Sequence, residues 1–171
     1  LNVGYAHLQL GDAAQAERVL RAVLAEAERL GLQNVRTYAK HNLGLSLGRL
    51  GALDEARAVE EEAVAAFRAQ GDRRMESASR IYLAQILGFG ERWDEAAAEA
   101  RAVATDEDTA APIRAGALAL LADAERRRGA HAEALAASGE AMRILGGLAG
   151  IEDGESLIRV AVQKEPDNQS Y

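Results

Sequence analysis

The chain has 171 residues, a net charge of −7 and no cysteine, which excludes disulfides, thiolate metal sites and cysteine catalysis. Acidic and basic residues are interleaved without a basic stripe, and the apolar stretches are too short to span a membrane. We therefore expect neither nucleic-acid binding nor membrane insertion, and a cytoplasmic location. Runs of alternating β-branched residues are absent, so the chain is expected to be all-α.

The predicted elements are helices throughout. Apolar periodicity, turn residues and caps place eight of them at about residues 1–10, 13–30, 34–49, 53–70, 74–88, 92–104, 111–128 and 131–146. A ninth is predicted at 152–165, with its apolar residues on one stripe, and serves either as a cap on the last pair or as the start of a further repeat. Because the first helix starts midway, we expect a fragment of a longer protein.

Four segments repeat in register along the chain. They read "LGDAAQAERVL" from Leu10, "LGALDEARAVE" from Leu50, "GERWDEAAAEA" from Gly90 and "RGAHAEALAAS" from Arg128. The seventh residue of each segment is an alanine, at positions 16, 56, 96 and 134, so the spacings are 40, 40 and 38 residues. Twelve residues before each alanine, directly after an apolar residue, stands a small one. These four small residues are Gly4, Gly44, Ala84 and Ala122.

This pattern resembles the tetratricopeptide repeat (TPR), a helix–turn–helix unit of about 34 residues, in its longer form of about 40 residues. The resemblance implies a right-handed superhelix (α-solenoid) of about four repeats plus a C-terminal helix. Residues 1–171 would then form one repeat domain, with repeats at about 1–33, 34–73, 74–110 and 111–150. The proline usual at the end of the repeat is missing.

Glycines and acidic residues mark the expected turns and caps. Gly31 and Gly71 are expected to follow helices at a C-cap position, and Gly51 to supply a positive φ in a turn. Gly44 should let the two helices of its repeat approach closely, whereas Gly48 and Gly88 are interpreted as positions that leave a groove open. Asp54 and Asp94 can cap or favour a helix start, and either Asp108 or Thr109 is expected to cap the helix that contains Pro112.

In the TPR family the concave face, lined mainly by the first helix of each repeat, binds peptide segments. The resemblance therefore implies a peptide groove formed by Asn2, Tyr5, Gln9, Tyr38, His41, Asn42, Leu45, Arg49, Tyr82, Gln85, Phe89 and Asp123. Asn2 and Asn42 each precede an apolar–small dipeptide, and a carboxamide there could hold an extended backbone. The alternative is that both bond only to a neighbouring helix. Tyr38 and Tyr82 equally well fill gaps between repeats.

No residue pattern indicates catalysis. The three histidines fall in different repeats, and the carboxylates at 60–62 ("EEE") are interpreted as a solvated helix face. We expect no enzymatic activity, no cofactor and no bound metal. The predicted function is a protein-interaction scaffold, similar to arrays in bacterial multidomain kinases and transcriptional regulators. Two alternatives stay open: a self-association module that forms a homodimer through terminal repeats, and a sensor of small molecules or signal peptides.

Overall fold

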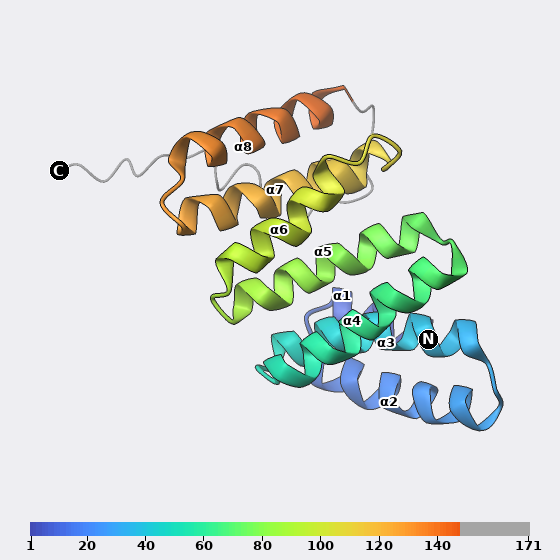
Figure 1. Cartoon of the computed structure of the whole chain (residues 1–171). Helices are drawn as coiled ribbons and strands as arrows, with labels where there is room; N and C mark the ends of the chain where they lie inside the picture. The colour runs from blue at the N-terminus through green and yellow to red at the C-terminus, as the bar shows by residue number, and fades with distance from the viewer. Residues whose placement is uncertain (148–171) are drawn as a thin grey trace. The chain divides into compact units, whose positions relative to one another are not determined.

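The computed structural model describes residues 1–147, which form eight α-helices joined by short turns (Figure 1). They are α1 (Asn2–Gln9), α2 (Ala13–Arg29), α3 (Gln33–Arg49), α4 (Leu53–Gln70), α5 (Arg73–Phe89), α6 (Trp93–Ala104), α7 (Ala111–Arg127) and α8 (His131–Gly146). Every end agrees with its predicted bound to within one residue, and the all-α prediction is confirmed. The ninth predicted helix lies outside the described residues.

Side-chain caps start two of the helices. Asp12 accepts a hydrogen bond from the Gln15 amide at 3.1 Å, and Asp72 accepts one from the Met75 amide at 3.0 Å. Each carboxylate satisfies a backbone donor that the first turn of a helix leaves unpaired. The capping prediction for α7 was wrong, because Ala110 is its N-cap residue and makes no side-chain cap bond.

Most turns close on a glycine with positive φ. Gly31, Gly51 and Gly71 have φ of 67°, 83° and 72°, which confirms the predicted turn and C-cap roles. The third repeat differs, because Glu91 stands at the position of Gly51, forty residues further along, and has a φ of 58°. A residue with a Cβ therefore adopts the left-handed region at this one turn.

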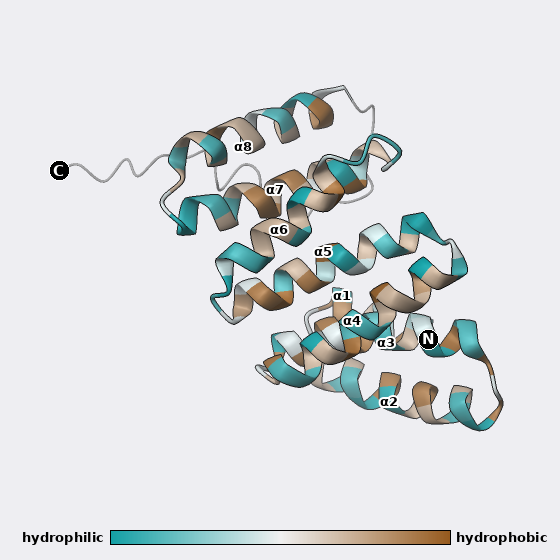
Figure 2. Ribbon diagram, in the orientation of Figure 1, coloured by the Kyte–Doolittle hydropathy of each residue, from teal (hydrophilic) through white to brown (hydrophobic). Residues whose placement is uncertain are grey.

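The chain divides into two compact units, of which the first is Leu1–Arg92 and the second begins at Trp93. In unit 1, α1 packs on α2 and α3, α3 packs on α2, α4 and α5, and α4 packs on α5. We call α1, α3 and α5, the first helices of their repeats, the first-helix row. Hydrophobic and hydrophilic residues share each helix (Figure 2), and the apolar ones form a core of Leu8, Ala16, Leu20, Leu43, Leu45, Leu47, Ala56 and Ile86.

Two glycines set the spacing inside the first two repeats. A Cβ on Gly4 would lie 2.7 Å from Leu20 Cγ, and one on Gly44 would collide with Glu60 Oε2 and lie 3.3 Å from the Ala56 carbonyl oxygen. An alanine at either position would force its neighbours to shift: the Leu20 side chain at Gly4, and the Glu60 side chain at Gly44, where the backbone is also close. The predicted role of Gly44 in helix–helix contact is therefore confirmed.

Unit 2 contains α6, α7 and α8 among its described residues, and α7 packs on both of the others. Its core is built mainly from alanine, together with Val103, Leu118, Ile144 and Leu145. Within residues 1–147, every helix falls short of the length or the hydropathy that a membrane span requires. The expectation that all repeats form a single domain stays a prediction.

Candidate functional site

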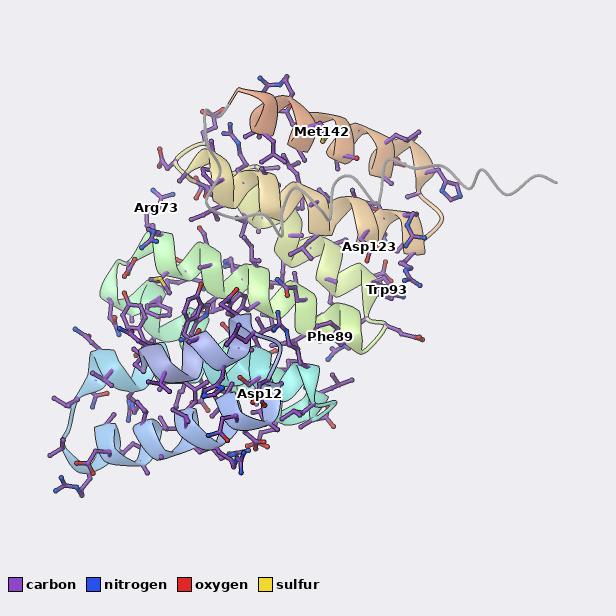
Figure 3. The ribbon with its side chains drawn as sticks, turned by 180° about the vertical axis from the view of Figure 1, so that it is seen from behind. Asp12, Arg73, Phe89, Trp93, Asp123 and Met142 are labelled. Carbon is purple, nitrogen blue, oxygen red and sulfur yellow. The ribbon has the colours of Figure 1, made fainter. Side chains whose placement is uncertain are left out.

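The predicted groove residues of unit 1 lie on the first-helix row, but they differ in exposure. Within residues 1–147, Tyr5 and Phe89 are the most exposed aromatic residues, each 47% exposed. Figure 3 shows Phe89 at the C-terminal end of α5, with Arg73 at the opposite end. Asn2 and Gln9 on α1 are also exposed. Four further predicted residues are half-buried: Tyr38, Arg49, Tyr82 and Gln85.

The prediction that Leu45 lines the groove was wrong. Its side chain is 1% exposed and belongs to the core of unit 1, because α3 lies in contact with four other helices. Its equivalent forty residues earlier is the exposed Tyr5 on α1, which contacts only α2 and α3. The repeat register therefore placed both residues correctly on their helices, but neighbouring helices decide which one reaches solvent.

Gly48 has a different role from the predicted one. It is buried, and a Cβ there would lie 2.9 Å from Ile86 Cγ1 and 3.3 Å from Phe89 Cδ2. Both atoms belong to α5, so the missing side chain lets α5 approach α3. Gly48 closes the space between two first helices rather than leaving a groove open.

Asn42 and Arg49 make internal hydrogen bonds. The Asn42 carboxamide donates to the Tyr38 carbonyl oxygen at 3.1 Å, and Asn42 is buried. The Arg49 guanidinium donates to the Leu8 carbonyl oxygen at 2.6 Å, which satisfies an acceptor at the C-terminal end of α1. The Asn42 bond lies within α3 and the Arg49 bond joins α3 to α1. Both side chains therefore have fewer free hydrogen-bonding groups for a ligand.

His41 belongs to a buried polar cluster that joins three helices. Its Nδ1 lies 2.9 Å from Glu60 Oε1 of α4 and 2.9 Å from Ser79 Oγ of α5. The His41 ring also stacks on Tyr82, with centroids 4.3 Å apart and planes 7° apart. The Glu60 side chain is 0% exposed and that of His41 is 7% exposed, so both ionisable groups are shielded from solvent.

The electrostatics of the cluster are set by burial. Desolvation raises the pKa of the Glu60 carboxyl, and the opposing effects of the His41 charge and of hydrogen bonds from His41 and Ser79 do not restore its ordinary value. Among the described residues Glu60 Oε2 has no hydrogen-bond partner. This oxygen occupies the space that a Cβ on residue 44 would need. A buried carboxyl with one unsatisfied oxygen favours its protonated form.

Sequence reasoning missed Glu60, which was assigned to a solvated run of three glutamates. The register contained the signal, because Leu20 is the equivalent residue forty positions earlier and Gly4 is the equivalent of Gly44. A large side chain opposite a glycine therefore occurs in both repeats. Equivalence to a leucine marks Glu60 as an inward-facing position, whereas Glu61 and Glu62 are exposed.

Serine, histidine and glutamate also meet in hydrolytic triads, but this geometry differs from one. A triad needs the serine on one ring nitrogen and the carboxylate on the other. Here Ser79 and Glu60 both lie on Nδ1 of His41. Ser79 is also fully buried, which denies a substrate access to its hydroxyl. The arrangement supports helix packing and not acyl transfer.

In unit 2, Asp123 lies on α7 (Figure 3) and is half-buried. It pairs with Arg126 at 2.8 Å and with Arg127 at 3.8 Å. The buried carboxylate nearby is Glu125, which pairs with Arg101 of α6 and, at 2.6 Å, with Arg128. Residues 1–147 hold no group of three or more histidine or carboxylate side chains placed to bind a metal ion.

Comparison with known proteins identifies the fold. No family model matches the chain, and no curated protein does. Among solved structures, the chain is similar to the nearly identical TPR-like repeats of a Podosopora anserina protein described as a kinesin light chain. The TM-score is 0.72 at 20% sequence identity, over 95% of this chain and 82% of that one. The chain therefore has a TPR-like repeat fold, an α-solenoid, as the repeat pattern indicated.

Proposed function

We propose that the first-helix row of unit 1 binds an extended segment of another protein, and that the chain acts as an interaction scaffold without chemistry of its own. The observation that carries this proposal is the exposure of Tyr5 and Phe89. The chain has only seven aromatic residues, and these two stand on first helices with 47% of each residue exposed. Exposed aromatic side chains are enriched at protein interfaces because they bury a large area at low entropic cost.

The fold supports the same function. Repeat arrays of this kind present extended surfaces, and TPR-like repeats generally mediate protein–protein interactions. The half-buried Gln85, on the same helix as Phe89, adds an amide that can donate to and accept from a peptide backbone. A partner that combines apolar side chains with an extended backbone fits these groups.

The formal charges of the helices further restrict the kind of segment that this surface would bind. Helix α3 carries three basic residues and no acidic one, and α5 carries three arginines and one glutamate. Helix α4, a second helix, has five acidic residues and two arginines. The net positive formal charge of α3 and α5 favours an acidic segment over a basic one, even though the whole chain is acidic.

A peptide library displayed on phage tests this proposal. Peptides selected on the full chain should lose affinity for Phe89→Ala and Tyr5→Ala by about tenfold or more, because each change removes an exposed anchor. They should be enriched in acidic and apolar residues. Leu135→Ala is the matched control, since Leu135 is exposed but stands on α8, a second helix. Equal binding to all three variants would contradict the assignment of this surface.

Self-association is a second candidate, favoured by one observation. Val3 on α1 is 60% exposed, whereas its equivalent Leu43 on α3 is 1% exposed under its neighbours. The side of α1 that carries Val3 could therefore accept a helix from a second copy. Sedimentation of the wild type and of Val3→Asp over a range of concentrations tests this. A concentration-independent monomer in both cases excludes it.

A further inference from the structure

We propose that His41, Glu60 and Ser79 form a proton-dependent latch: at neutral pH the His41–Glu60 pair keeps one proton, and loss of that proton loosens α5 from the α3–α4 hairpin. This inference does not depend on the proposed function. It concerns a buried site that links three helices and that no step of peptide binding requires.

The geometry places an ionisable pair at the junction of the three helices. His41 is on α3, Glu60 on α4 and Ser79 on α5, and all three are buried. With both ring and carboxyl deprotonated, the site would hold a negative charge away from water, with Oε2 lacking any hydrogen bond among the described residues. With one proton shared by the pair, the site is neutral or a paired ion, and either state avoids the cost of an isolated buried charge.

Many of the other charged groups on the surrounding helices pair with one another. These pairs are His7 with Asp12, Arg21 with Glu17 and Glu55, Lys40 with Glu62, Arg57 with Glu61, Glu76 with Arg68 and Arg80, and Tyr38 with Asp72. The charge that acts on the Glu60 carboxyl is that of His41. The proton of the pair is therefore held by burial and by His41, and not by a neighbouring surface charge.

The sign of the pH dependence follows from the direction of the shift. The folded-state pKa of Glu60 is raised above the ordinary value of 4.5. The stability that this contributes is fully present below that ordinary value and is lost as the pH rises through the folded-state pKa. Above about pH 6.5 a histidine in the unfolded chain is also mostly neutral. Where the unfolded chain has lost this proton and the folded pair still holds it, folding takes up one proton, so the folding constant falls by up to about tenfold per pH unit.

Loosening of α5 would also affect side chains of α5 that lie at the surface of the molecule. The Tyr82 ring stacks on His41, and Gln85 and Phe89 follow on the same helix. A change in the proton content of the pair therefore alters the support of Gln85 and Phe89, about one to two helical turns away. The latch couples the solution pH to the order of α5.

Native-state hydrogen exchange of the full chain tests the latch. Peptides covering residues 73–89 report the opening of α5, after correction for the intrinsic pH dependence of exchange. Between about pH 6 and pH 9 the wild type should lose protection in α5 by about tenfold or more, beyond what Glu60→Gln loses. Glu60→Gln keeps the size of the side chain but cannot ionise. Glu61→Gln, the exposed neighbour on the same helix, should behave as the wild type.

Identical pH dependence in the wild type and in Glu60→Gln would overturn the proposal. If Glu60→Gln does not fold, carbon-13 NMR of the wild type decides the question directly. The Glu60 carboxyl and the His41 ring should together retain one proton at pH 7. A carboxylate and a neutral imidazole at that pH would overturn the latch.

Discussion

The first two helix pairs of unit 1 solve the same packing problem with opposite chemistry. In α1–α2, Gly4 faces Leu20, and in α3–α4, Gly44 faces Glu60. The two pairs share one register forty residues apart, and Leu1 stands where the second pair has His41. The glycine thus accommodates a large side chain in both cases, whether it is apolar or ionisable. The comparison shows that the repeat conserves the space opposite the glycine, whereas the side chain that fills this space differs between the two helix pairs.

The largest expected effect on stability comes from replacing only one of the two ionisable residues of the α3–α4 pair by the leucine found in the α1–α2 pair. His41→Leu alone leaves Glu60 buried without its partner, which should destabilise unit 1 by about 3–5 kcal/mol at neutral pH. The loss should shrink at acidic pH, because a protonated Glu60 carries no charge. Urea unfolding at pH 7 and pH 5, followed by exchange of unit 1 peptides, measures both values.

The double variant His41→Leu/Glu60→Leu completes the conversion. It should recover the stability of the wild type or exceed it, since an apolar pair of similar size is often at least as stable as a buried ion pair. Ser79 can then turn its hydroxyl to a carbonyl oxygen one turn back in α5. A double variant as unstable as His41→Leu alone would show that the two repeats are not interchangeable.

A smaller effect is expected from filling the shared space. Gly44→Ala should destabilise unit 1 by roughly 1–3 kcal/mol, because the new Cβ meets Glu60 and the backbone oxygen of Ala56. Gly4→Ala should cost less, since its new Cβ meets only the flexible side chain of Leu20 on α2, and Gly4 lies in α1, a shorter helix. Gly139→Ala is the control, because its Cβ would enter open space and helix propensity alone favours alanine. Equal losses at all three glycines would contradict this packing account.

The smallest effect concerns the turns. Gly51 has a φ of 83°, whereas its equivalent Glu91 adopts a φ of 58°. Glu91→Gly should stabilise unit 1 by about 0.5–1 kcal/mol, because relief of the left-handed strain outweighs the added freedom of the unfolded chain. Gly51→Ala should act in the opposite direction by a similar amount. Thermal unfolding of both variants provides the measurement, and a destabilised Glu91→Gly variant would show that the Glu91 side chain stabilises the turn.

The candidate site could be predicted only in part. Tyr5, Gln9 and Phe89 were placed on the first helices by register, and the structure finds them exposed there. Their role in binding stays a prediction. Leu45 was wrongly expected on the surface, because register gives the face of a helix but not the neighbours that cover it. Glu60 was overlooked because a run of carboxylates suggests solvent, although its equivalence to Leu20 in the repeat marks it as an inward-facing position.

The sequence by itself determined the helices, their ends and their repeat. Alanine-rich periodicity, the turn glycines and the recurring small residues act within a few positions, so no distant contact is needed to interpret them. Tertiary structure alone decided which of the equivalent positions are buried and that His41, Glu60 and Ser79 meet. These three residues come from three helices separated by up to 38 positions. The packing of α3 against α4, which Gly44 allows, and of α5 against α3, which Gly48 allows, brings them together and removes water from them.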